Sequence, residues 1–135
     1  MSTRIDVALI LWNPDVIQLV SLVLRHQNLR SRGVEPSQGA DEIQDLIVSG
    51  SPSVVVFDLK PPYYESAAFV LSLAGRFPDP SFVITCADPV LALKAAPWLC
   101  CYPILQKPYE PDEICEAVRS MVRRRRVNSP ALEYH

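Results

Sequence analysis

Short apolar segments alternate with segments of helical periodicity five times along this chain of 135 residues. The clearest apolar segment, residues 53–57, contains Val54, Val55 and Val56 in succession and is followed by Asp58. Continuous β-branched runs of this length are typical of strands buried on both faces of a parallel sheet. Helices between such strands cover both faces of the sheet. The sequence therefore predicts a doubly wound α/β domain, with five parallel strands as the middle of three layers.

Local signals set the expected boundaries of these elements. Asn13 is suited to cap a helix whose first position is Pro14, and Gly50 is suited to end the second helix. Arg30 and Arg32 make the second apolar segment weak, as is common in an edge strand. We expect strands at residues 5–11, 29–34, 53–57, 82–84 and 104–105. We expect helices at residues 15–26, 40–48, 65–77, 89–96 and 111–125.

Length and hydropathy indicate one domain in the cytoplasm. A chain of 135 residues can bury one hydrophobic core, and we expect the domain to span residues 1–126, followed by a tail at residues 127–135. No apolar run approaches the roughly 18 residues of a membrane span, and the first residues lack the apolar stretch of a signal peptide. We therefore expect no membrane contact.

The four cysteines agree with this placement. Cys86 and Cys115 fall within segments that we expect to be buried or half-buried. Cys100 and Cys101 are adjacent, without a second pair at the spacing of a zinc site. We interpret all four as structural thiols, since free cysteine is among the most buried residue types. A redox role for the adjacent pair remains the alternative.

Polar residues follow three of the expected strands at one edge of the sheet. Asp58 comes after the third strand, Thr85 after the fourth and Lys107 after the fifth. A carboxylate can accept a phosphoryl group, a hydroxyl can hydrogen-bond its oxygens, and an ammonium can offset its charge. Ligands of open α/β sheets bind at this edge. The spacing therefore predicts a functional site here.

Three motifs carry a resemblance to a known family. They are Asp58-Leu59-Lys60-Pro61-Pro62, Thr85-Cys86 and Lys107-Pro108, in this order. Over about residues 5–125 the chain resembles the receiver domain of bacterial two-component response regulators. The resemblance implies a flavodoxin-like, receiver-type fold. It also implies a phosphoacceptor at Asp58, a switch position at Thr85 and a cis peptide bond between Lys107 and Pro108.

The chain departs from this family where two metal-binding carboxylates are expected. Counting back from Pro14-Asp15, those positions fall on Leu11 and Trp12, and neither side chain offers Mg²⁺ an oxygen ligand. We expect the Trp12 indole to occupy the space of the ion. Asp58 and Lys107 together carry a charge near zero, so we expect no metal and no cofactor. Asp15 is the alternative source of an oxygen ligand.

Two positions linked to switching in the family are also changed. The position three before Lys107, often Tyr or Phe, is Ile104, and the residue after Pro62, often Gly, is Tyr63. The aromatic side chain that rotates on phosphorylation is therefore absent. A conventional aromatic switch is not expected.

The segment before the fifth strand is the candidate interaction surface, with Trp98, Leu99 and Tyr102 as its apolar members. The resemblance places partners and dimers on this side of the domain. A loop packed against its own domain is the alternative. The run at residues 123–126 is four arginines, but the chain has a net charge of −2 and the run lacks interleaved aromatics. The sequence therefore argues against nucleic acid binding.

These features predict a receiver-like module of a phosphorelay with a degenerate, Mg²⁺-free site that acts through protein contacts and is not an enzyme. The expected partner is a signalling protein or a histidine kinase, and a homodimer is left open. His26 and His135 fall away from the predicted site, so no base is available and no catalytic residue is expected. One alternative is a working receiver phosphorylated on Asp58 by a histidine kinase. Another is a small flavodoxin-like enzyme.

Overall fold

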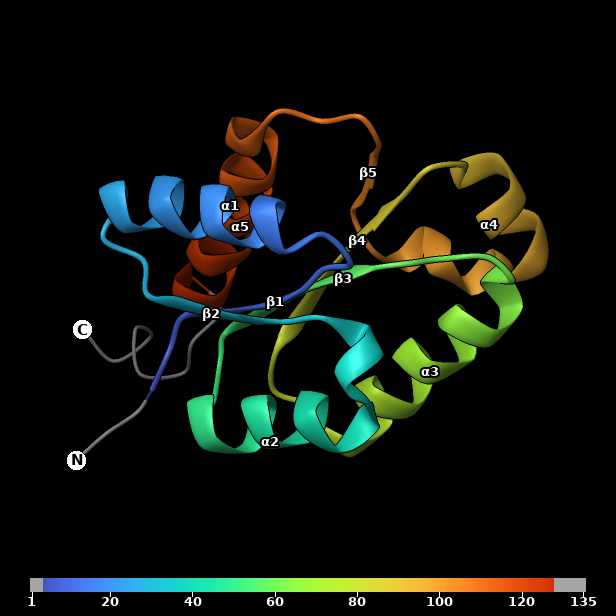
Figure 1. Ribbon diagram of the computed structural model, residues 1–135, viewed down its shortest axis with the longest axis horizontal. Helices are drawn as coiled ribbons and strands as arrows, with labels where there is room; N and C mark the ends of the chain where they lie inside the picture. Colours follow the sequence, from blue (N-terminus) through green and yellow to red (C-terminus); the bar gives the residue numbers. More distant parts are fainter. Residues whose placement is uncertain (1–3, 128–135) are drawn as a thin grey trace.

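The computed structural model describes residues 4–127, in which five parallel strands alternate with five α-helices (Figure 1). The strands are β1 (Val7–Ile10), β2 (Ser31–Val34), β3 (Val54–Asp58), β4 (Ser81–Cys86) and β5 (Ile104–Gln106). The helices are α1 (Pro14–His26), α2 (Ala40–Gly50), α3 (Tyr63–Arg76), α4 (Pro89–Ala95) and α5 (Pro111–Val127). The strand order is β2-β1-β3-β4-β5. The predicted doubly wound α/β fold is confirmed.

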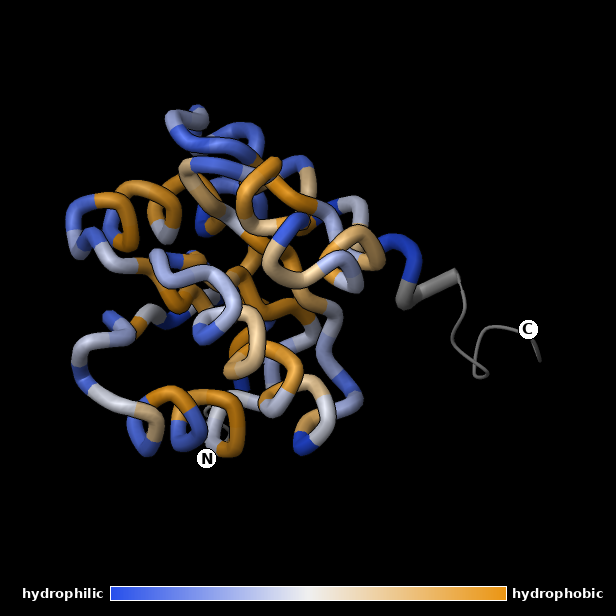
Figure 2. Tube along the Cα trace, turned by 90° about the vertical axis from the view of Figure 1, so that its right-hand side faces the viewer, coloured by the Kyte–Doolittle hydropathy of each residue, from blue (hydrophilic) through white to orange (hydrophobic). Residues whose placement is uncertain are grey.

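Alternate residues of each strand point to opposite faces of the sheet and supply two separate cores. The core beneath α1 and α5 takes these residues from β1 and β3: Val7, Leu9, Val54 and Val56. The core beneath α2, α3 and α4 takes the intervening residues: Ala8, Ile10, Val55 and Phe57. Figure 2 shows hydrophobic segments running through the middle of the molecule. Burial on both faces explains why β1 and β3 are continuous apolar runs.

The turn from β1 into α1 follows the predicted capping pattern. The Asn13 side chain accepts a hydrogen bond from the backbone N–H of Asp15, and Pro14 occupies the first helical position. Since Pro has no N–H to leave unpaired, this helix start is well satisfied. Leu11 and Trp12 are therefore held between the carboxyl end of β1 and the first turn of α1.

Strand β2 begins at Ser31, two positions later than the sequence predicted. The backbone N–H groups of Gln27, Asn28 and Leu29 donate to carbonyls in the last turn of α1. Asn28 takes a φ of 61°, a left-handed conformation common where helices end. These residues close the helix, so they are not free to join the sheet.

Helix α3 begins at Tyr63 instead of the expected residue 65. The Pro62 carbonyl accepts hydrogen bonds from the N–H groups of Glu65 and Ser66. The buried ring of Tyr63 packs into the core beneath α2, α3 and α4. The first turn of the helix is therefore fixed by packing that local sequence signals do not reveal.

The segment between α4 and β5 is a 3₁₀ helix, Pro97–Cys101, where the sequence predicted a loop. Leu99 N–H donates to the Ala96 carbonyl at 3.0 Å, and Tyr102 N–H donates to the Leu99 carbonyl at 3.0 Å. The Leu99 side chain is completely buried in the core beneath α2, α3 and α4. The burial of Leu99 explains why this segment is ordered against the domain.

Helix α5 extends to Val127, past the expected end at residue 125. The tail predicted at residues 127–135 thus lies almost wholly outside the described residues, and the domain boundary stays a prediction. In Figure 2, the end of α5 is a strongly hydrophilic segment that projects from the body. None of the helices within residues 4–127 combines the length and the hydrophobicity needed to cross a membrane.

Candidate functional site

Three polar side chains meet at the carboxyl end of the sheet. Asp58 is the last residue of β3 and lies opposite Thr85 of β4 in the strand register. Thr85 Oγ1 donates a hydrogen bond to Asp58 Oδ1 at 3.1 Å, and Lys107 Nζ donates one to Asp58 Oδ2 at 2.6 Å. The structure therefore brings together the three residues that the strand ends predicted. Their roles stay a prediction.

Backbone pairing fixes the positions of these side chains. Leu59 N–H donates to the Thr85 carbonyl at 2.8 Å, and Lys107 N–H donates to the Cys86 carbonyl at 2.9 Å. Asp58 is only 2% exposed because β3 is the central strand, whereas the Lys107 side chain is 37% exposed. A buried carboxylate is tolerated when it is paired and hydrogen-bonded. Lys107 and Thr85 supply both conditions.

Trp12, in the corner after β1, also contacts Asp58. Its indole Nε1–H donates to the Asp58 backbone carbonyl at 3.1 Å, and its backbone N–H approaches Asp58 Oδ2 at 3.4 Å. Lys60 Nζ lies 4.4 Å from the centroid of the Trp12 ring, in a cation–π arrangement. The sequence indicated a space-filling indole but not these hydrogen bonds. The residue type alone indicated that the indole would have a hydrogen-bond acceptor, since a Trp N–H usually finds one when it is buried.

Comparison with known proteins yields structural similarity only: no family model matches the sequence, and no curated protein matches it. The signal receiver domain of an HD domain-containing protein from Pseudomonas fluorescens aligns with a TM-score of 0.74 at 16% identity, covering 93% of this chain and 99% of that one. The receiver domain of nitrogen regulatory protein C aligns with a TM-score of 0.70 at 19% identity, covering 90% and 97%. This chain has the receiver fold.

A third similar structure is the Vibrio cholerae chemotaxis protein CheY4. Its TM-score is 0.70 at 12% identity, and the alignment covers 87% of this chain and 98% of that one. Identities this low establish the architecture alone. The chemistry of the site has to be argued from its own residues.

The residues at this site do not fit the Mg²⁺ ion that the resemblance to receiver domains implies. Leu11 is 1% exposed and packs into the core beneath α1 and α5, and Trp12 presents an indole. Asp15 is exposed in the first turn of α1 and does not line the cavity beside Asp58. Within residues 4–127, no three His, Cys, Asp or Glu side chains gather as a metal site would require. Mg²⁺ needs oxygen ligands, and Asp58 is already held by Lys107.

The structure also describes the peptide bond after Lys107 and the two changed positions, Ile104 and Tyr63. The Lys107–Pro108 peptide bond is cis, as the resemblance implies. Ile104 is half-buried at the start of β5. The Tyr63 hydroxyl accepts a hydrogen bond from the Asp88 N–H at 3.2 Å, and burial raises the pKa of Tyr63. Tyr63 therefore joins α3 to the start of α4 as a neutral phenol.

Tyr109 is a site residue that the sequence did not indicate. It lies two positions after Lys107 and packs against the core beneath α1 and α5. Burial raises the pKa of Tyr109 to about 12, and the negative charge of Asp58 acts in the same direction. A tyrosine just after the Lys-Pro pair was visible in the sequence, but only the fold reveals its proximity to the carboxylate.

The predicted interaction surface needs a correction. Leu99 is completely buried, so it cannot belong to a surface. Trp98 and Tyr102 are half-buried and pack edge to face on each other, with ring centroids 6.4 Å apart. The exposed apolar side chains on this side belong instead to α4, where Val90 is 64% and Leu91 is 52% exposed.

All four cysteines are free thiols. Cys86 and Cys115 are buried as expected, and burial raises the pKa of each thiol. Cys100 and Cys101 are exposed, which contradicts a purely structural role for this pair. They lie on the 3₁₀ helix beside β5.

Proposed function

We propose that this chain is a receiver-like signal transduction module that acts through protein contacts, with a degenerate site that neither binds Mg²⁺ nor depends on phosphorylation. The observation that carries the proposal is the closed set of bonds around Asp58. Lys107 and Thr85 donate to its two carboxylate oxygens, the Trp12 backbone N–H approaches Oδ2, and the Trp12 indole donates to its backbone carbonyl. The carboxylate is thus satisfied without an ion.

The energetics of phosphoryl transfer support this proposal. In a reaction at Asp58, the attacking oxygen would be one that already accepts a 2.6 Å ion pair or a 3.1 Å hydrogen bond, which lowers its nucleophilicity. Without a metal, the charge that develops on the transferred group would lose a stabilisation of several kcal/mol. Each 1.36 kcal/mol corresponds to about tenfold in rate. Phosphorylation of Asp58 should therefore be slower by orders of magnitude than at a site that holds a metal.

Exposed apolar side chains on α3 and α4 support a role in protein contacts. Tyr64 is 62% exposed on α3, and Val90 and Leu91 are more than half exposed on α4. Isolated exposed apolar residues are common, but Val90 and Leu91 are adjacent on a helix of seven residues. The proposed partner is a signalling protein, such as a histidine kinase, or a second copy of this chain.

The alternative is a working receiver that is phosphorylated on Asp58. The arrangement of Asp58, Thr85 and Lys107 favours it, because all three keep the bonds that a phosphoacceptor site would use. This alternative requires a metal held by a different ligand set, or a reaction that proceeds without one.

Incubation with acetyl phosphate and Mg²⁺, followed by intact-protein mass spectrometry, separates the two functions. The proposal predicts no phosphoryl adduct above that seen without Mg²⁺. The matched control is Asp58→Asn, which keeps the shape of the side chain. A Mg²⁺-dependent adduct that is present in the wild type and absent in this variant would establish the alternative.

Affinity capture tests the contact role separately. Wild-type, Asp58→Asn and Leu91→Asp chains are used as baits, and bound proteins are quantified. The proposal predicts the same bound protein on the first two baits and its loss from the third. Loss from Asp58→Asn alone would show that the carboxylate, and not the α4 surface, controls the contact.

A further inference from the structure

A cavity of about 410 Å³ opens beside the buried carboxylate, between α1 and the segment that joins β5 to α5. Leu11, Val16 and Leu19 line it on the α1 side, and Pro108 and Tyr109 line it on the other. Small-molecule sites are typically cavities of this size, lined mainly by apolar side chains with a few polar groups. The receiver fold thus carries an apolar pocket in contact with Asp58.

The polar groups of the pocket are hydrogen-bond donors. Lys107 Nζ has three donors and gives one to Asp58, and its side chain is 37% exposed. The Asn13 oxygen accepts from Asp15 N–H, which leaves the Asn13 amide nitrogen as the donating end. The Asp58 oxygens already accept from Lys107 and Thr85. A ligand that fits this pocket therefore brings a hydrogen-bond acceptor.

The charge around the pocket suits an anionic acceptor. Leu11 occupies a position where the resemblance places a carboxylate, so one source of repulsion is missing. Asp58 and Lys107 form a neutral pair. The pocket also touches the starts of two helices, Asn13 at α1 and Pro111 at α5, where backbone dipoles favour anions. The first turns also contain Asp15, Asp112 and Glu113, but none of these residues lines the pocket.

We propose that this pocket binds a small carboxylic acid with a compact apolar body. The carboxylate lies against the ammonium of Lys107, and the apolar body covers Leu11, Val16 and the half-exposed Leu19. Charge-assisted hydrogen bonds of this kind are about twice as strong as neutral ones. This inference goes beyond the proposed function, since the ligand can bind whether or not the domain docks to a protein.

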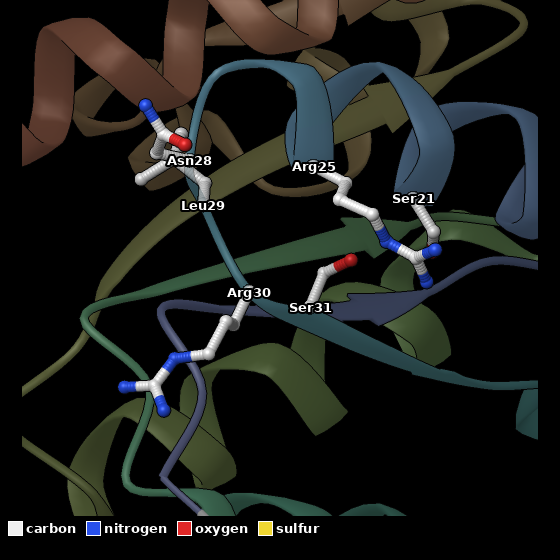
Figure 3. Close-up of a pocket in the computed structure, with 6 residues that line it drawn as sticks. All are labelled: Ser21, Arg25, Asn28, Leu29, Arg30 and Ser31. Carbon is white, nitrogen blue, oxygen red and sulfur yellow. The ribbon is translucent and has the colours of Figure 1, made fainter.

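A second cavity, of about 400 Å³, lies at the opposite end of α1. It shows why arginine side chains in the lining do not by themselves make an anion-binding site. It contains Arg25 and Arg30 together with Ser21 and Ser31. Figure 3 shows the Arg25 side chain extending toward Ser21, whereas Arg30 extends away from it. The two guanidinium groups do not converge on a common point. The pocket beside Asp58, in contrast, combines a mainly apolar lining with the hydrogen-bond donors of Lys107 and Asn13.

The test uses 3-phenylpropionate as the probe and its uncharged amide, 3-phenylpropionamide, as the matched comparison. Both are titrated into the ¹⁵N-labelled wild-type protein at millimolar concentrations, and backbone amide shifts are followed by NMR. We expect saturable shifts at Leu19, Lys107 and Tyr109 with the acid, and binding about tenfold weaker with the amide. Absence of saturable shifts, or equal binding of acid and amide, would overturn the proposal.

Two variants on one helix locate the binding site. Val16→Trp places an indole in the pocket and should weaken probe binding at least about tenfold. Leu22→Trp adds the same side chain at a half-exposed position of α1 that does not line the pocket, and should leave binding unchanged. Equal loss in both variants would refute the assignment. The comparison of acid with amide needs only the wild-type chain, so it remains decisive if Val16→Trp fails to fold.

Discussion

Two regions at the same edge of the sheet differ in polarity. The ends of β3, β4 and β5 present Asp58, Thr85 and Lys107, which form one hydrogen-bonded group. The corner after β1, which adjoins the same carboxylate, presents Leu11 and Trp12. One half of the site is polar and internally paired, and the other is apolar and aromatic.

The difference shows how a buried carboxylate can persist without an ion. In the polar half, Lys107 balances the charge of Asp58 and Thr85 hydrogen-bonds it. In the apolar half, Trp12 contributes packing and donates from its indole to the Asp58 backbone. The polar half thus supplies the shorter bonds to the carboxylate, and the β1 corner adds the longer contact from Trp12 N–H to Oδ2 at 3.4 Å. Each half can be disturbed separately, and the sizes of the effects test this division.

Removal of the lysine should have the largest effect. Lys107→Met keeps the aliphatic stem but leaves Asp58 buried and unpaired, which should lower the free energy of unfolding by about 2–4 kcal/mol. The lower part of the range allows for the 37% exposure of Lys107. Urea denaturation measures the change, with Lys94→Met on exposed α4 as the control.

A compensating variant tests the cause of that loss. Adding Asp58→Asn to Lys107→Met removes the unpaired charge while an amide oxygen remains available to Thr85. Most of the lost stability should return. If the double variant is as unstable as Lys107→Met, the loss comes from packing, and Lys107 does not stabilise the fold by balancing the charge of Asp58.

Replacement of the indole should have a smaller effect. Trp12→Ala removes the hydrogen bond to the Asp58 carbonyl and the packing of a half-buried ring, so the free energy of unfolding should fall by about 1–3 kcal/mol. Trp12→Phe keeps most of the ring and should lose about 1 kcal/mol, the typical net value of one hydrogen bond. Thermal or urea denaturation measures both. Unchanged stability in Trp12→Ala would mean that the apolar half does not support the carboxylate.

The half-buried phenol of Tyr109 predicts an alkaline loss of stability. Its pKa is raised from 10.0 to about 12 in the folded protein. The raised pKa means that the folded state favours the neutral phenol. The corresponding stability is fully present below pH 10 and is lost as the pH rises toward 12.

Tyr109→Phe should therefore make the alkaline decline in stability shallower, measured by urea denaturation below pH 10 and near pH 12. Ultraviolet titration of the wild type should show a phenol that ionises near pH 12 and disappears in this variant. Tyr64→Phe, at a position 62% exposed on α3, is the control. The same alkaline decline in wild type and Tyr109→Phe would contradict the prediction.

Loss of the cation above the indole should have the smallest effect. Lys60→Met removes the ammonium that lies 4.4 Å from the Trp12 ring centroid, at an exposed position. Such contacts are worth about 0.5–1 kcal/mol in exposed sites. The same substitution in a Trp12→Ala background should have no effect, because the partner ring is absent. An equal effect in both backgrounds would show that Lys60 acts independently of Trp12.

The sequence predicted the polar half well because its signals are local. The β-branched run Val54–Val56 locates the central strand, and strands of a parallel sheet end at a common edge. The polar residues at the carboxyl ends of β3, β4 and β5 therefore had to lie near one another. Asn13 and Pro14 likewise fixed the start of α1 through rules that involve only neighbouring residues.

The remaining features depend on contacts between distant residues. The hydrogen bond from Trp12 to Asp58 joins positions 46 residues apart, and nothing local indicates which carbonyl the indole reaches. The sequence placed Leu99 on a candidate interaction surface, whereas in the structure its side chain is packed in the core. The raised pKa of Tyr109 likewise results from tertiary burial and from the nearby charge of Asp58.

The most direct test of the central claim is amide NMR of the wild-type protein, titrated first with Mg²⁺ and then with beryllofluoride, a phosphoryl mimic. If Asp58 is held by Lys107, Thr85 and Trp12 without a metal, amide signals of these residues should stay unchanged at millimolar Mg²⁺ and after beryllofluoride is added. Saturable shifts at Asp58, Thr85 and Lys107 that require Mg²⁺ would contradict this account and show a working phosphorylation site.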